Sequence, residues 1–145
     1  MENNKSGIAP RVSDQGPASF TVHLSQTTCR NSNFRTTLWT GTYLQMTLMC
    51  IPPRGEIGLE MHSDTDQFLR LESGVGAVRM GSEKDKLCFQ KCIRAGDGVF
   101  VPAGTWHNII NTGRYPMKLY SVYAPPKHPR GTVHQTKAIA DASED

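Results

Sequence analysis

The sequence predicts an all-β domain, a sandwich or small barrel built from short antiparallel strands. Thirteen glycines and nine prolines punctuate the 145 residues, recurring about every eight to twelve residues, which is the spacing of turns in all-β folds. Between these turns, apolar and polar residues alternate with a period of two, as in strands that bury one face. A helical pattern occurs only near the C-terminus, over 136–142.

The expected strands are justified by this alternation and by the turn residues that flank them. The alternation is clearest in 44–50, 67–72 and 117–123. The other candidates are shorter apolar runs between turn signals. In chain order, the expected strands are 20–24, 36–40, 44–50, 57–62, 67–72, 75–80, 87–93, 98–101, 108–111 and 117–123.

Three segments are expected along the chain. Residues 1–18 are polar and rich in Asn, Ser, Gly and Pro, so they are expected to form a flexible N-terminal arm. Residues 19–124 hold the strands and form the barrel domain. Beyond them, Pro125, Pro126 and Pro129 cannot donate hydrogen bonds to a strand ladder. Residues 125–145 are therefore expected to be a tail that carries the short helix.

Composition excludes several classes of function. Charged residues make up 20% of the chain and the formal net charge is only +3, with basic residues scattered, so we expect no nucleic-acid partner. No apolar run approaches the roughly 18 residues of a membrane span, and the N-terminus lacks the apolar core of a signal peptide. We therefore expect a soluble, cytoplasmic protein with no membrane partner. Free thiols are then expected at Cys29, Cys50, Cys88 and Cys92.

His107 is the strongest candidate for chemistry. It follows a turn at Gly96, a short apolar strand over 98–101 and a second turn at Pro102 and Gly104, and it begins the next strand. A side chain held between a tight turn and a sheet has few rotamers, which suits a metal ligand. Histidines in such positions are also common as ordinary surface or core residues, so the position alone does not show that His107 binds a metal.

A second polar cluster surrounds His62. On a strand, Glu60 and His62 point to the same face, and after the turn 63–66, Gln67 opens the return strand on a face that carries leucines. If that face is the interior, the three polar side chains converge, and a metal ion would satisfy all of them. In the alternative, Glu60 faces water and the turn is a solvated hairpin.

The stretch 96–111 resembles the second sequence motif of the cupin superfamily. That motif, G-x5-P-x-G-x2-H-x3-N, is matched at every fixed position, namely Gly96, Pro102, Gly104, His107 and Asn111. The match makes the assignment of His107 to a metal site much more specific than its position alone.

The first cupin motif, G-x5-H-x-H-x3,4-E-x6-G, is matched in part. Aligned from its final glycine, Gly74, it places Gln67 at the glutamate, His62 at the second histidine and Glu60 at the first. Both internal spacings are kept, but Gly55 precedes Glu60 with four intervening residues instead of five, and two ligand types change. A second alignment takes His62 and Asp64 as the histidine positions and puts a phenylalanine at the carboxylate position, so we prefer the first.

The resemblance covers about residues 36–124 and is nearest to small single-domain cupins described as mannose-6-phosphate-isomerase-like. It implies a jelly-roll barrel of two antiparallel sheets, with a metal or small-ligand pocket at its mouth, and a homodimer. The ligand set that it implies carries one negative charge, like the family's three histidines and one glutamate, and suits a divalent Mn, Fe, Ni, Co or Zn ion. This set is Glu60, His62, Gln67 and His107.

The function implied by the resemblance is that of a metal-dependent enzyme acting on a small molecule of unassigned identity. The reaction would be isomerase-like, on a sugar or sugar phosphate, or dioxygenase-like. The alternatives are a non-catalytic cupin that binds or senses a carbohydrate or other small ligand, and a barrel that has lost its metal. Tyr123 and His134 are the candidates for moving protons.

A few further residues bear on the substrate. By strand parity Arg70 and Lys118 point outward, which leaves Arg35 as the interior cation that a phosphate would need. His128 and His134 lie in the tail, which is expected to be solvated unless it folds over a barrel mouth. Aromatic residues are expected to wall the pocket or, more simply, to pack the core: Trp39, Tyr43, Phe100, Tyr120 and Tyr123.

Overall fold

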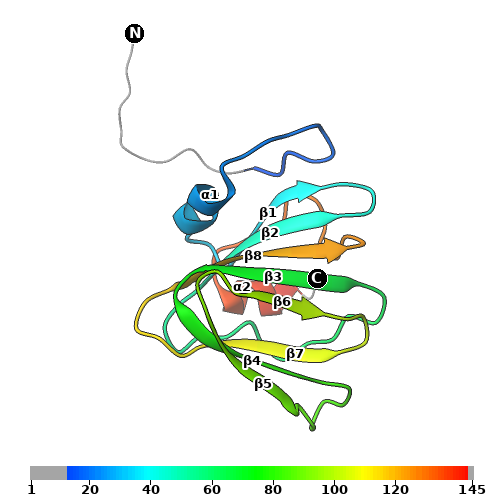
Figure 1. The fold of residues 1–145 in the computed structure, drawn as a ribbon. Helices are drawn as coiled ribbons and strands as arrows, with labels where there is room; N and C mark the ends of the chain where they lie inside the picture. Colours follow the sequence, from blue (N-terminus) through cyan, green and yellow to red (C-terminus); the bar gives the residue numbers. More distant parts are fainter. Residues whose placement is uncertain (1–12, 144–145) are drawn as a thin grey trace.

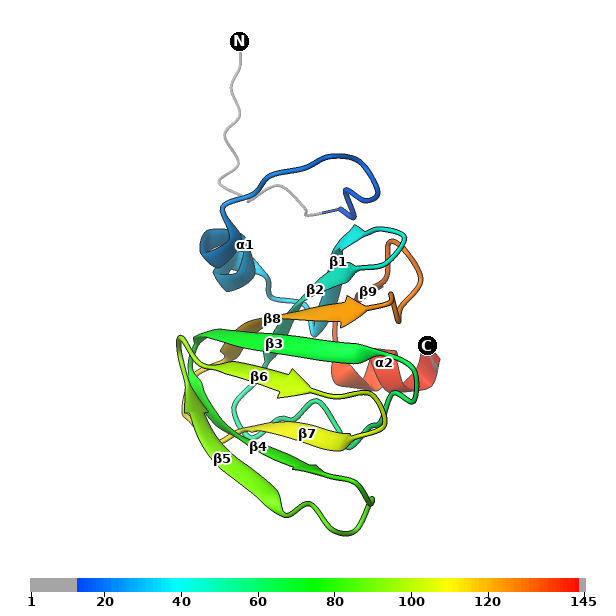
Figure 2. The same cartoon turned by 45° about the vertical axis from the view of Figure 1, so that its right-hand side comes forward.

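The computed structural model describes residues 13–143, which fold into two antiparallel sheets that face each other (Figures 1 and 2). The larger sheet has the strand order β6-β3-β8-β2-β1-β9 and the smaller one β5-β4-β7. The strands are β1 (Arg35–Thr40), β2 (Gln45–Ile51), β3 (Asp66–Ser73), β4 (Val75–Gly81), β5 (Phe89–Arg94), β6 (Gly98–Val101), β7 (Trp106–Asn111), β8 (Met117–Ala124) and β9 (Val133–His134). Two short helices, α1 (Leu24–Arg30) and α2 (Lys137–Ser143), lie outside the sheets. The predicted all-β barrel with a short C-terminal helix is confirmed.

The barrel interior is apolar at one end and polar at the other. Along the central strands β2 and β8, inward residues at the apolar end include Met49, Ile51, Met117 and Leu119, all buried in one core cluster. At the opposite end the inward positions carry polar groups, among them Gln45 at the start of β2. Because buried polar groups need partners, this polar end is where a site is expected.

Helix α1 covers the outer face of the larger sheet. Leu24 at its start packs against a second apolar cluster formed by Leu38, Leu48 and Tyr120. This is why β2 and β8 are buried on both faces. The strand predicted over 20–24 is wrong: this segment forms no strand, and its last residue begins α1. The short run is apolar because it packs on a sheet, and period-two alternation cannot distinguish that from pairing within one.

Two further segments differ from the predicted strands. The run expected over 57–62 forms no strand, and isolated bridges from Glu56 to Ile110 and from Glu60 to His107 hold this part of the chain. Strand β9 was not predicted, since it is only two residues long and pairs with β1. The remaining predicted strands are present, and none of their ends is shifted by more than two residues. All four cysteines are free.

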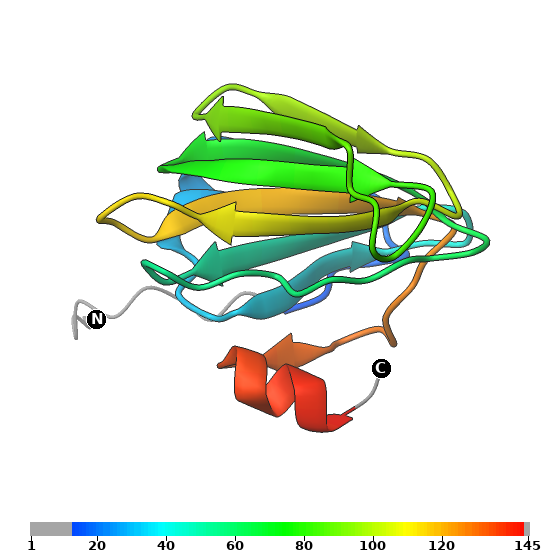
Figure 3. The same cartoon turned by 90° about the horizontal axis from the view of Figure 1, so that it is seen from below.

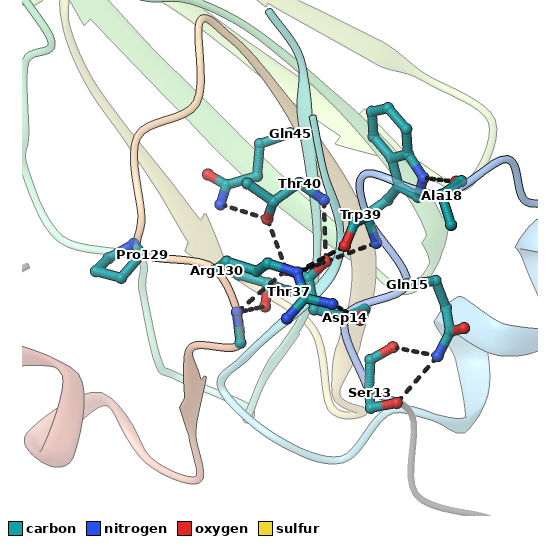
Figure 4. Close-up of polar contacts among 12 residues, drawn as sticks. Ser13, Asp14, Gln15, Ala18, Thr37, Trp39, Thr40, Gln45, Pro129 and Arg130 are labelled. Atoms are coloured by element: carbon teal, nitrogen blue, oxygen red, sulfur yellow. Dashed lines mark hydrogen bonds and ion pairs between the residues drawn. The ribbon is translucent and has the colours of Figure 1, made fainter. Parts of the chain in front are cut away.

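Residues 13–18, which the sequence analysis assigned to the flexible arm, lie against the barrel through Asp14 (Figure 4). Its carboxylate accepts hydrogen bonds from the Thr40 amide at 3.0 Å, the Thr40 hydroxyl at 2.6 Å and the amides of Gly16 and Gly131. Burial alone would raise the pKa of Asp14, but these hydrogen bonds outweigh it and lower the pKa below its usual value. Residues 1–12 of the predicted arm lie outside the described residues.

The C-terminal tail folds back onto the barrel instead of being solvated. Figure 3 shows it leaving the end of β8 and returning to β9 and α2 beside the sheet. His128 and His134 are both buried, so the expectation of a solvated tail is wrong. No helix of residues 13–143 is long and apolar enough to cross a membrane.

Candidate metal centre

His107 is the second residue of β7, just after the turn expected at Pro102 and Gly104. Gly104 has a φ of 83°, which glycine adopts without strain, and its amide donates to the His62 carbonyl at 2.7 Å. The Nδ1 atom of His107 lies 2.9 Å from the Thr105 carbonyl oxygen. Because a carbonyl only accepts, Nδ1 carries the proton, and in the neutral ring Nε2 keeps its lone pair for a ligand.

Glu60 is held opposite His107 by the backbone. The Glu60 amide donates to the His107 carbonyl at 3.0 Å and the His107 amide donates to the Glu60 carbonyl at 2.9 Å. This pair of bonds makes Glu60 and His62 neighbours of His107, although they are distant in sequence. Glu60 and His62 were predicted to point to the same face, and the structure groups both of them with His107.

The three side chains bring one ligand atom each to a common point. Glu60 Oε2 lies 3.5 Å from His107 Nε2 and 3.7 Å from His62 Nε2, and all three atoms lie within 4.8 Å of one another. Two ligands of one metal ion are about 3.0–3.4 Å apart when each bond is about 2.1 Å long. Small rotations of the side chains would therefore close the set around an ion.

Each of these three atoms is buried and has no hydrogen-bond partner within residues 13–143. The Glu60 side chain is 28% exposed, but its Oε2 atom is enclosed. Burial would raise the pKa of Glu60, but the neighbouring His107 and His62 rings, 3.5 and 3.7 Å away, outweigh it and hold the pKa well below its usual range. The group is an anion at neutral pH, and a cation between it and the two imidazoles would satisfy all three atoms.

Gln67 and Tyr123 extend the polar surface across three strands. In the ladder, Gln67 of β3 and Gln45 of β2 both lie opposite Tyr123 of β8. The Gln67 amide nitrogen donates to the Ser121 hydroxyl at 2.7 Å, while its Oε1 is buried without a partner. That oxygen is free to accept a ligand's hydrogen bond or to bind an ion. Gln67 as a fourth metal ligand stays a prediction.

The two candidates for moving protons lie in different places. The Tyr123 ring contacts His62 edge-on, with centroids 5.8 Å apart, and is 1% exposed. Burial and the negative charge of Glu60 raise the pKa of Tyr123, so its hydroxyl stays protonated at neutral pH. His134 lies on β9, where its Nδ1 is 3.3 Å from Arg35 Nη1 and its Nε2 is 3.1 Å from the Ser143 hydroxyl.

A cavity of about 220 Å³ opens beside Glu60. Its wall combines Arg35 of β1, His128 of the tail and residues of α2, so elements at both ends of the chain build it. The full lining is Phe34, Arg35, Ile57, Glu60, His128, Ala140 and Asp141. Arg35 was the cation left for the interior once parity had placed Arg70 and Lys118 outside, and it is buried. The contribution of α2 was missed, because the sequence carries no signal of where a tail helix packs.

The aromatic wall proposed from the sequence is wrong for most of its members. Tyr43 and Phe100 are 81% and 73% exposed, and Tyr120 packs under α1 on the outer face of the sheet. The Trp39 indole donates to the Ala18 carbonyl outside the site. Only Tyr123 reaches the centre, so the pocket is mainly polar.

Comparison with known proteins agrees with this architecture. Residues 47–123 match the family model described as Cupin domain. The crystal structure of BH2720 from Bacillus halodurans superposes with a TM-score of 0.90 at 55% identity, covering 90% of this chain and 99% of that one. The uncharacterized protein YrkC of Bacillus subtilis is 54% identical over 134 residues, 92% of this chain and 72% of YrkC. The uncharacterized protein L612 of Acanthamoeba polyphaga mimivirus is 34% identical, over 79% of this chain and 70% of L612.

Proposed function

The chain belongs to the cupin domain family, and on this premise we propose that it binds one divalent first-row metal ion through Glu60, His62 and His107 and acts with it on a small molecule. The observation that carries the proposal is the convergence of three buried ligand atoms without other partners. A two-histidine, one-carboxylate set leaves coordination positions open for a substrate.

The chemistry of the donor set suits such an ion. Imidazole and carboxylate ligands suit Mn, Fe, Co, Ni and Zn, and the set does not select one of them. When bound, the ion would supply Lewis-acid polarisation of a substrate oxygen. Glu60 would offset part of the ion's charge, and the hydrogen bond to Thr105 holds the His107 ring so that Nε2 faces the ion.

The residues around the centre suit proton movement more than binding of an extended sugar. Tyr123 presents a protonated hydroxyl on a ring that contacts His62, which fits a proton donor. The tail and α2 form part of the cavity wall. An isomerase-like proton transfer on a hydroxy-carbonyl compound is the version that these groups support best. The mannose-6-phosphate-isomerase-like subgroup, the homodimer and a dioxygenase-like reaction stay predictions.

Calorimetric titration of chelator-treated protein with each of the five metal ions tests the proposal. We expect a stoichiometry of one ion per chain for the wild type and loss of binding in His107→Ala. The control is His23→Ala, which removes an exposed histidine far from β7 in the sequence and should bind as the wild type does. Equal binding by His107→Ala and wild type would refute the metal centre.

A turnover assay then distinguishes a catalytic function from ligand binding alone. The metal-loaded protein is assayed for isomerisation of small hydroxy-carbonyl compounds, anaerobically and in air. Turnover that needs oxygen would favour the dioxygenase-like version. Ligand binding without turnover under any metal would establish the non-catalytic alternative.

A further inference from the structure

The wall of the cavity beside the metal centre holds a buried guanidinium and a buried imidazole that the metal site does not use. We propose that Arg35 and His128 form an oxyanion subsite that binds the carboxylate or phosphate group of a small anionic ligand. The inference deepens the proposed function, since it assigns a substrate class to the same pocket, but the subsite itself is made only of residues outside the metal triad.

Arg35 forms no ion pair with any carboxylate of residues 13–143. Its side chain lies inside the barrel, the residue is 6% exposed, and its Nε atom is buried with no hydrogen-bond partner in the described part of the chain. Nη1 lies 3.3 Å from the His134 ring, and the guanidinium stands over the Phe34 ring at 5.2 Å. Neither contact neutralises it. A buried cation is costly unless it is paired, so this position favours an anion.

His128 supplies the second donor. Both of its ring nitrogens are buried without a partner in residues 13–143, and its ring stands edge-on to Tyr123 at 5.2 Å. Burial, with the nearby positive charge of Arg35, lowers the pKa of His128 to about 3. The ring is therefore neutral at pH 7 and offers one N–H donor and one acceptor.

The position of His128 is fixed before any ligand arrives. The Gln45 side chain accepts from the amides of Lys127 and His128 at 3.0 and 2.9 Å and donates to the His128 carbonyl at 2.7 Å. This buried clamp joins the tail to the first residue of β2. A preorganised donor loses little entropy on binding, which is the arrangement of a binding site.

Size and charge limit the ligand. A volume of about 220 Å³ is below the range of drug-sized pockets, which begins near 300 Å³, so the ligand is a small metabolite. Besides Glu60, the cavity wall contains one carboxylate, that of Asp141, and it accepts a hydrogen bond from Lys137 Nζ at 2.7 Å. Guanidinium groups recognise carboxylate and phosphate through paired N–H donors, and these two oxyanions share the chemistry that the subsite requires.

Anion binding is tested on metal-loaded and metal-free protein by calorimetry. The probes are acetate, lactate, succinate and inorganic phosphate, with lactamide as the neutral counterpart of lactate. We expect at least one anion to bind and lactamide to bind about tenfold more weakly or not at all, because charged hydrogen bonds contribute about 1.5–3 kcal/mol. Phosphate or carboxylate as the best probe identifies which oxyanion the site takes.

Three variants complete the test. Arg35→Gln and His128→Leu should each weaken the best anion about tenfold or more, while each still binds one metal ion per chain. Arg70→Gln removes an exposed arginine on the outer face of β3 and should leave anion affinity unchanged. Since Arg35 is buried, His128→Leu keeps the test decisive if Arg35→Gln fails to fold.

The outcomes separate the two proposals. The subsite is overturned if no probe anion binds the wild type, or if the folded Arg35 or His128 variant binds the best anion as tightly as the wild type. Anion binding that depends on Arg35 in a protein that takes up no metal would refute the metal centre and leave the subsite standing.

Discussion

The clamp made by Gln45 gives the sharpest prediction about how the tail is held. The residue is fully buried, and its amide makes four hydrogen bonds, to the Thr40 hydroxyl, the Lys127 amide, and the amide and carbonyl of His128. Gln45→Leu keeps the approximate side-chain volume and removes all four. We expect the tail around His128 to detach locally while the barrel stays folded.

The expected loss of free energy of unfolding follows from the number of hydrogen bonds removed. At about 1 kcal/mol net for each hydrogen bond, the loss of four lowers the free energy of unfolding by up to about 4 kcal/mol. Keeping the freed amide and carbonyl groups buried would cost about 1–3 kcal/mol each, whereas opening the tail lets water hydrate them. The tail therefore opens, and the observed loss is limited to the free energy that holds it.

Hydrogen exchange and urea unfolding measure the effect. In Gln45→Leu, protection of the amides of Lys127 and His128 should fall at least about tenfold, which corresponds to about 1.4 kcal/mol, and the urea midpoint should fall. Gln90→Leu is the control, because Gln90 is exposed and makes one hydrogen bond, to the Leu87 carbonyl. Unchanged protection at both amides would refute the reasoning.

Three further predictions concern stability and metal. Asn111→Ala removes three hydrogen bonds of a buried side chain, to the Ile51 and Tyr115 carbonyls and from the Gly113 amide. The free energy of unfolding in urea should fall by about 3 kcal/mol while metal titration is unchanged, and loss of metal binding in the folded variant would contradict a purely structural role. Because the pKa of Asp14 is lower in the folded protein than its unfolded value near 3.8, the ionised carboxylate stabilises the fold above that pH, and this stabilisation is lost as the pH falls through the folded pKa. The free energy of unfolding in urea should therefore change less between pH 7 and pH 3 in Asp14→Asn than in the wild type. Equal changes in the two proteins would contradict this role of Asp14. Chelator treatment should lower the melting temperature of the metal-loaded wild type and leave that of His62→Ala unchanged, and a drop in both proteins would contradict the assignment of His62.

The strands were predictable because their signal is local. Alternation places Leu69 and Leu119 on the inner face and Arg70 on the outer face, and the structure confirms it. The spacing from Gly96 to Asn111 predicted a turn that fixes a buried histidine, and His107 is at that place. These features depend on a few neighbouring residues, which the sequence displays directly.

The tail and the outer layer were not predictable in the same way, because their positions depend on distant packing. The run 20–24 is apolar since it covers an apolar patch around Leu48, and nothing local distinguishes this from a strand. His128 is buried because Gln45, 83 residues away, binds its backbone. A buried glutamine in an apolar strand is the one signal that could have indicated a clamp.

The site itself was predicted in part. Glu60, His62 and His107 were named from the sequence, and they converge. The oxyanion subsite needed the structure, because Arg35 and His128 meet only through the return of the tail. The sequence could suggest Arg35 as an interior cation, but it could not show that His128 lies beside it.

Anomalous diffraction from crystals of the metal-loaded protein, recorded at the absorption edge of the bound ion, shows whether Glu60, His62 and His107 bind that ion. We expect one strong peak per chain, about 2.0–2.2 Å from a Glu60 carboxylate oxygen and from the Nε2 atoms of His62 and His107. A metal-loaded crystal with its peak elsewhere, or with Glu60 turned out of the barrel, would contradict it.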